Sequence, residues 1–220
     1  PSAMDFTQVQ EESELQATLA RTDWAKVGRL GMVVALALLA FFLKRPAVRW
    51  LSLGATLVVL GFLDAGFLSV SHLTAGIWVG PGVFLRDLPL LILAVVTGVT
   101  TLVWGRVFCG FLCPFGALQD VLERVVPRRW RVRVPWSVHR PALKVKYVVL
   151  GVIAVSALVG SHASLYQYVE PFGTVFFPSR SVLLWAIAGA FLVGAAVIPR
   201  FYCRYACPLG AVLALVSFLS

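Results

Sequence analysis

The chain has 220 residues, of which 60% are hydrophobic and only 13% are charged, and its mean hydropathy is +0.88. A soluble domain carries about half apolar and about a quarter charged residues. The composition therefore excludes a disordered chain, a disulfide-stapled secreted fold and a free cytosolic enzyme. The formal net charge of +9 is of a kind that membrane proteins concentrate in cytoplasmic loops. We predict an integral membrane protein.

Apolar segments long enough to cross the roughly 30 Å hydrocarbon core of a bilayer recur along the chain. They lie at about 27–43, 51–70, 87–105, 147–161 and 182–199, and a sixth begins at Pro208. None of these apolar segments alternates with a period of two, so we predict helices and not strands. The predicted fold class is an all-α membrane protein with about six transmembrane helices.

Lys and Arg residues are divided unevenly between the two sides that these spans define. Fourteen fall on one side: Lys44, Arg45, Arg49, Arg106, Arg124, Arg128, Arg129, Arg131, Arg133, Arg140, Lys144, Lys146, Arg200 and Arg204. Five fall on the other side, together with the acidic residues of the N-terminal segment. The positive-inside rule then places the fourteen-charge side in the cytoplasm and residues 1–26 outside the membrane, with 27–220 as the membrane core. Because the chain starts with Pro and stops inside the sixth segment, we expect it to be part of a longer protein.

The cytoplasmic connection 114–146 has two parts. Residues 114–126 begin with Pro at a helix-start position and predict an interfacial helix. Its apolar face is formed by Leu118, Val121, Leu122 and Val125. Gln119 and Asp120 are expected to point away from that face. The following PRRWRVRVPW alternates cations with apolar residues, as expected of a segment that rests on anionic lipid. No nucleic-acid recognition motif accompanies the charge, so we predict no nucleic-acid partner.

All four cysteines lie in two copies of one pattern. The first copy is RVFCGFLCPFGA, residues 106–117, and the second is RFYCRYACPLGA, residues 200–211. Six of the twelve positions are identical at a constant offset of 94, and each copy follows a long apolar segment. We therefore predict a parallel internal repeat, about 51–117 and 147–211. Its axis along the membrane normal would bring the four thiols together at the cytoplasmic ends of the spans.

The candidate ligands are Cys109, Cys113, Cys203 and Cys207. Four thiolates are the usual ligands of an iron–sulfur cluster, and the Cys-x3-Cys-Pro ending also occurs in bacterial ferredoxin sequences. The Pro after each pair can begin a helix, whose positive end would stabilise a negatively charged cluster. Gly116 and Gly210 would allow a ligand or a neighbouring backbone to approach closely. Structural cysteines, a zinc site and a dithiol relay remain open as alternatives. The favoured cofactor is an iron–sulfur cluster of the [4Fe–4S] type.

Four segments carry a family resemblance: GRVFCGFLCPFGALQD, VHRPALKVKY, YVEPF and RFYCRYACPLGA. In this order and spacing they resemble the transmembrane core of the NosR-type proteins, within the NosR/NapH group of membrane iron–sulfur proteins. The resemblance covers about 21–220. It implies a multi-pass protein of the bacterial inner membrane that transfers electrons and is not an independent enzyme.

The resemblance also implies partners and further cofactors. Electrons would come from quinol or a cytoplasmic ferredoxin-like donor and leave to a periplasmic redox partner, serving a reductase system such as nitrous oxide reduction. Family members carry an FMN-binding periplasmic domain and two ferredoxin-type 4Fe–4S sites, which cannot be placed on any residue of this chain. The alternative is a non-catalytic scaffold or assembly subunit of a larger complex, with structural zinc or free thiols.

Two acidic residues are further candidates for contact with a proton, a quinol or a partner. Asp64 lies in the outer half of a predicted span, where an ionisable side chain is costly. It could carry a proton, bind a quinol hydroxyl, pair with a cation such as Arg86, or reach water at the interface. Glu170 lies in an external loop, where it could contact a partner, although capping of a re-entrant turn is favoured. We expect His72 and His162 to be interfacial histidines and not haem ligands.

Overall fold

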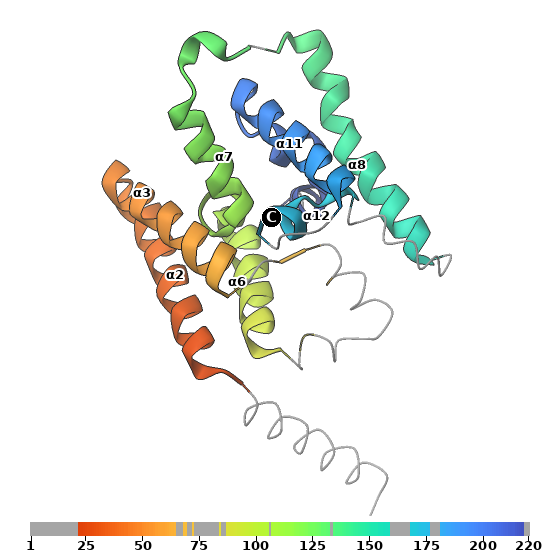
Figure 1. The fold of residues 1–220 in the computed structure, drawn as a ribbon. Coiled ribbons are helices and arrows are strands. Elements are labelled where there is room, and N and C mark those ends of the chain that lie inside the picture. Colours follow the sequence, from red (N-terminus) through yellow and green to blue (C-terminus); the bar gives the residue numbers. More distant parts are fainter. Residues whose placement is uncertain are drawn as a thin grey trace, which may run out of the picture.

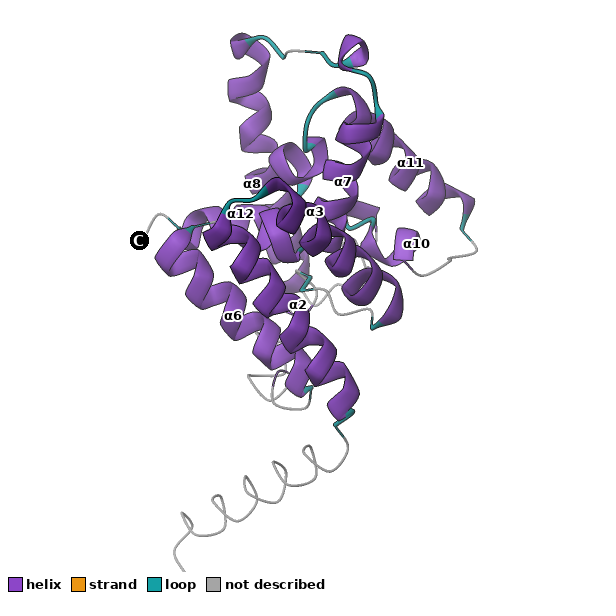
Figure 2. Ribbon diagram, turned by 90° about the vertical axis from the view of Figure 1, so that its left-hand side faces the viewer, coloured by secondary structure: helices purple, strands orange, loops and turns teal. Residues whose placement is uncertain are grey.

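The computed structural model describes residues 22–64, 68–69, 72, 84, 87–105, 107–132, 134–158, 168–176 and 181–217. Within this part of the chain every regular element is a helix, which confirms the all-helical prediction (Figure 2). Among the described residues, two helical segments are long and apolar enough to cross a membrane, Trp24–Leu43 and Pro46–Leu63. The larger number of about six transmembrane helices therefore stays a prediction.

These two segments form an antiparallel hairpin at the N-terminal end of the described chain (Figure 1). Helix α2 (Trp24–Leu43) begins where the Asp23 side chain accepts a hydrogen bond from the Ala25 N–H, at 3.1 Å. It ends at Lys44, whose φ of 52° reverses the chain. Helix α3 (Pro46–Ala55) then starts with Pro at its first position and continues into the π-helical η1 (Thr56–Leu63).

Each cysteine motif lies in a unit with the same order of elements: an apolar helix, a π-helical turn and a second helix. The first unit consists of α6 (Leu88–Trp104), η2 (Phe108–Leu112) and α7 (Pro114–Val125). The second consists of α11 (Val182–Val197), η4 (Tyr202–Ala206) and α12 (Pro208–Val216). The two π-helical turns match in length and are separated by the offset of 94 that separates the cysteines. The local structure of the motif is therefore duplicated, while the symmetry axis expected between the two halves stays a prediction.

Three elements connect the two units. They are η3 (Arg128–Trp130), α8 (Trp136–Leu158) and the short α10 (Phe172–Phe176). Helix α8 begins earlier than the span expected at 147–161, so the end of the basic connection is helical, and Lys146 within it is buried. Helix α8 packs against α12 and η4, which explains how a helix with a charged first half is held in place.

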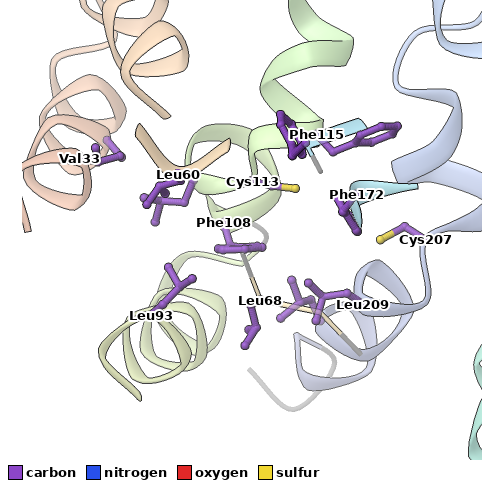
Figure 3. Packing of buried hydrophobic residues seen from close by; sticks show 14 of the residues in the cluster. Val33, Leu60, Leu68, Leu93, Phe108, Cys113, Phe115, Phe172, Cys207 and Leu209 are labelled. Carbon is purple, nitrogen blue, oxygen red and sulfur yellow. The ribbon is translucent and has the colours of Figure 1, made fainter. Parts of the chain in front are cut away.

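The core lies where the two units meet α2, η1 and α10 (Figure 3). Aromatic rings contribute much of it, and they contact one another edge to face. Phe115 of α7 lies 5.3 Å from Phe172 of α10 and 5.0 Å from Tyr202 of η4, measured between ring centroids. Two of the cysteines, Cys113 and Cys207, are buried members of this same cluster.

Helix α7 buries a different face from the one that its apolar pattern predicts. Gln119 is 0% exposed and Asp120 is buried, whereas Val125 is 74% exposed. The expectation that Gln119 and Asp120 point away from the packed face is therefore wrong. The physical reason is that both side chains find polar partners on other elements, so their burial does not leave unpaired groups.

Candidate iron–sulfur site

The two cysteine motifs have the same local backbone. The N–H of Cys113 donates to the carbonyl of Phe108, and the N–H of Cys207 donates to the carbonyl of Tyr202, each at 2.9 Å. Both cysteines have extended backbone angles and stand directly before the first turn of a helix that starts with Pro. Each of these two thiols is thus placed at the positive end of a helix, as the sequence predicts.

A glycine stands three residues after the second cysteine of each motif, where the backbone of the first cysteine leaves little room for a side chain. A Cβ on Gly116 would lie 2.5 Å from the carbonyl oxygen of Cys109, and one on Gly210 would lie 3.2 Å from that of Cys203. The first turn of each helix therefore touches the backbone of the first cysteine. This confirms the expectation that the two glycines allow a neighbouring backbone to approach closely.

The structure brings all four cysteines together, and none of them forms a disulfide. Cys113 and Cys207 are buried, and Cys109 and Cys203 are half-buried. Figure 3 shows the sulfurs of Cys113 and Cys207 pointing toward one another from the starts of α7 and α12. Cys113 and Cys207 belong to one buried cluster, and Cys109 and Cys203 pack against it. The cysteines of the two motifs therefore form one group, although 94 residues separate them in sequence.

A single metal ion needs its ligands close together. Four thiolates around one zinc ion, with Zn–S bonds of about 2.3 Å, have sulfurs about 3.8 Å apart. Among the described residues, no three His, Cys, Asp or Glu side chains are close enough together to hold one ion. In a [4Fe–4S] cluster each cysteine binds a different iron atom, so the ligand sulfurs are spread around the cluster. The donor set of four thiols is the one that such a cluster uses.

Hydrogen-bond donors already point at two of the sulfurs. The N–H of Gly210 donates to Cys207 Sγ at 3.3 Å, and Gln119 Nε2 donates to Cys203 Sγ at 3.1 Å. Burial and the neighbouring Cys109 raise the pKa of the Cys203 thiol to about 12. The metal-free thiol is therefore neutral, and a bound cationic iron atom would displace its proton while the donors stabilise the thiolate.

Gln119 joins the two motifs. Besides its bond to Cys203, its Oε1 accepts a hydrogen bond from the N–H of Tyr202 at 3.2 Å, and its Nε2 lies 3.4 Å from the carbonyl of Phe115. Helical periodicity assigns such a polar residue to a solvated face, so the sequence pattern did not predict the burial of Gln119 or its contact with Cys203. Its presence in the GALQ segment that carries the family resemblance was the available indication.

Asp120 holds two arginines and is a second residue that the sequence argument missed. Arg200 binds its carboxylate through Nε and Nη2, each at 2.7 Å, and Arg49 Nη2 binds it at 2.8 Å. The Asp120 carboxylate raises the pKa of Arg200 above its usual value. Arg200, the first residue of the second motif, has a φ of 53°, a conformation that costs a non-glycine residue free energy. The two-point contact with Asp120 holds it there and fixes the start of the motif.

Glu170 lies next to the cysteine group. It is buried, and it accepts a hydrogen bond from the Ser69 hydroxyl and interacts electrostatically with Tyr202. The ring of Phe172, two residues on, lies 5.8 Å from that of Tyr202. A segment expected in an external loop thus packs against the cysteine motifs, and its contact with Ser69 is one that the sequence did not predict.

Asp64 lies at the end of η1 and forms an ion pair within the described chain. Its carboxylate accepts hydrogen bonds from Arg29 Nε at 2.9 and 3.2 Å, and its side chain is 6% exposed against 40% for Arg29. An ion pair was one of the states expected for Asp64, and the structure shows that its cation is Arg29 of α2. Arg86, the cation named from the sequence, and His162 lie outside the described residues.

Comparison with known proteins gives the class to which this site belongs. Residues 87–133 and 181–220 match the family model of a 4Fe–4S binding domain, and these two segments contain all four cysteines. Regulatory protein NosR of Pseudomonas aeruginosa is 39% identical over 178 residues, which are 74% of this chain and 24% of that protein. Protein NirI of Paracoccus denitrificans is 36% identical over 212 residues, 86% of this chain and 30% of that protein.

A third relative is the methylamine utilization ferredoxin-type protein MauN of Paracoccus denitrificans. It is 30% identical over 139 residues, 60% of this chain and 46% of that protein. No solved structure matches the chain.

The fold, the thiol group and the matched domain define an iron–sulfur protein, which confirms the predicted cofactor. Within this class the chain belongs to the NosR-type family, over the region that it shares with NosR and NirI. It spans about a quarter to a third of the length of those two relatives. The relatives and the two apolar helices together indicate a membrane protein.

Proposed function

We propose that the chain is the electron-transferring membrane core of a NosR-type protein and supplies electrons to a periplasmic reductase system, such as that of nitrous oxide reduction. In this proposal a single cluster is held by Cys109, Cys113, Cys203 and Cys207. The observation that carries it is that the thiols of two motifs far apart in sequence meet in one core: Cys113 and Cys207 share a buried cluster, and Cys109 and Cys203 pack against it.

A [4Fe–4S] cluster supplies the ability to take up and release one electron at a time. The residues of the chain would hold and tune it. Gly210 N–H and Gln119 donate hydrogen bonds to ligand sulfurs and so stabilise their negative charge. The Phe115 and Phe172 rings exclude water from the inner side of the thiol group. Asp120, through Arg200, fixes the start of the second motif.

The proposed setting is the bacterial inner membrane, which the chain crosses several times with its N-terminus in the periplasm. The charge asymmetry supports a cytoplasmic position for the cysteine motifs. The donor is then quinol or a cytoplasmic ferredoxin-like site, and the acceptor is a periplasmic redox partner or an FMN domain of a larger complex. The basic residues around 128–140 would rest on anionic lipid. Asp64 and Glu170 are proposed contacts for a proton, a quinol or a partner.

The experiment is to purify the protein anaerobically in detergent and to measure iron and acid-labile sulfide per chain, with EPR spectra before and after dithionite. We expect four iron atoms and four sulfides per cluster, and their loss in Cys109→Ala and in Cys207→Ala. Val33→Ala, which removes buried side-chain volume from α2 away from the cysteines, is the control for general destabilisation. One zinc ion per chain, or four alkylatable thiols without metal, would overturn the proposal in favour of a structural site or a dithiol relay.

A further inference from the structure

The hydroxyl group of Tyr202 is buried without a hydrogen-bond partner in the described part of the chain. Tyr202 is 0% exposed and is the largest of the fully buried side chains. Its ring is fixed by Phe115 and Phe191, each with its centroid 5.0 Å away. A buried hydroxyl normally has a partner, because leaving one unpaired costs the free energy of its lost hydration.

The surroundings of this hydroxyl indicate what the partner is. Tyr202 belongs to the same buried cluster as Cys113 and Cys207, and Cys203 packs against that cluster. Its side chain therefore lies beside the thiols that are proposed to hold the cluster. Sulfur atoms of a cluster and of its thiolate ligands accept hydrogen bonds, and such bonds help to set the reduction potential.

Two other positions show what is unusual about the Tyr202 hydroxyl: Tyr205 in the same turn and Phe108 in the first motif. Tyr205, in the same turn, has a partner, since its hydroxyl lies 2.7 Å from Nδ1 of His139. At the position equivalent to Tyr202, the first motif has Phe108, which is also buried but carries no hydroxyl. The second motif thus adds a donor at a position where the first has an apolar ring.

We propose that the Tyr202 hydroxyl donates a hydrogen bond to a sulfur of the bound cluster or to its Cys207 ligand and raises the reduction potential of the cluster. This inference rests on the proposed function, because it requires that the four thiols hold a cluster. Tyr202 is then a positioning and tuning residue that makes the two halves of the site inequivalent. A donor to sulfur stabilises the more negative, reduced state more than the oxidised state, which gives the direction of the effect.

The test is a redox titration of the full-length protein in detergent, followed by EPR, for the wild type, Tyr202→Phe and Tyr205→Phe. Removing the Tyr202 hydroxyl should lower the equilibrium constant for reduction about tenfold, a shift of about 59 mV to more negative potential for a one-electron couple. Tyr205→Phe should leave the potential unchanged. An intact cluster with an unchanged potential in Tyr202→Phe would overturn the inference and leave the proposed function standing. A wild-type protein without iron and sulfide would overturn the proposed function itself.

A second measurement applies if Tyr202→Phe assembles no cluster. In cluster-free protein the hydroxyl has no partner to lose, so Tyr202→Phe should unfold at the same temperature as the wild type or at a higher one. Tyr205→Phe, which loses a bonded hydroxyl, should unfold at a lower temperature. A cluster-free Tyr202→Phe that unfolds as early as Tyr205→Phe would show that the hydroxyl has a partner within the protein and would overturn the inference.

Discussion

The first cysteine motif has Phe108 and Phe111 beside its cysteines, whereas the second motif has Tyr202 and Tyr205 at the same positions. The backbone of the two motifs is nevertheless the same, with a π-helical turn, an extended second cysteine and a helix that starts with Pro. The duplication therefore fixes where the thiols lie, and the side chains around them differ.

The difference continues in the helices that follow. Gln119 and Asp120 of α7 reach across to η4 and bind Cys203 and Arg200. At the equivalent positions α12 has Leu213 and Ala214, which are buried among apolar residues. Leu213 and Ala214 have no polar side-chain atoms, so they make no equivalent contact to the first motif. The cysteines are duplicated, but the polar side chains around them are not, so the two halves of the site differ electrostatically.

The largest expected effect tests the shared backbone. Gly116→Ala places a Cβ against a backbone carbonyl that cannot move alone, and we expect it to destabilise the protein by about 3 kcal/mol and to abolish iron binding. Gly210→Ala meets a looser contact and should cost about 1 kcal/mol, with most iron retained. Thermal unfolding and iron content check both variants. Equal effects at the two glycines would contradict the difference in packing between the motifs.

Asp120→Asn tests the ion pairs that hold the second motif. It leaves Arg49 and Arg200 without their carboxylate, but both guanidinium groups reach water, so we expect a loss of about 2 kcal/mol. The loss should shrink as the salt concentration rises, because exposed charges are screened. Denaturant unfolding at low and high salt measures this. A loss that does not depend on salt would show that Asp120 acts through packing.

Gln119→Leu gives the first unit the residue that the second unit has at this position. It removes the donor to Cys203 and leaves the buried N–H of Tyr202 unpaired, so we expect a loss of about 1–2 kcal/mol. The reduction potential should also become more negative. Leu213→Met, a volume-conserving change at the equivalent position, should leave the potential unchanged. If both variants titrate like the wild type, the contact from Gln119 to Cys203 does not tune the cluster.

The smallest expected effect is that of Glu123→Gln. The Glu123–Arg131 pair is partly exposed and long, at 3.3 Å, so its loss should change stability by no more than about 0.5 kcal/mol. Iron content and potential should stay at their wild-type values. A large effect of Glu123→Gln would indicate that the charged side of α7 is coupled to the thiol group.

The sequence predicts those parts of the molecule that depend on local pattern. Apolar runs give the helices, the Pro after each cysteine pair gives the start of α7 and α12, and the duplicated spacing gives the four candidate ligands. The inward direction of Gln119 and Asp120 could not be predicted, because their partners lie about 80 residues away and helical periodicity assigns polar residues to a solvated face. The same holds for Glu170, whose burial depends on contacts with distant elements.

The most direct test of a single site shared by both motifs is iron and acid-labile sulfide per chain in two double variants, Cys109→Ala/Cys113→Ala and Cys203→Ala/Cys207→Ala. If one cluster is held by all four thiols, removing either pair should abolish iron binding, and both variants should lack the EPR signal of the reduced protein. Retention of about half of the wild-type iron in each double variant would show two separate sites and contradict the account.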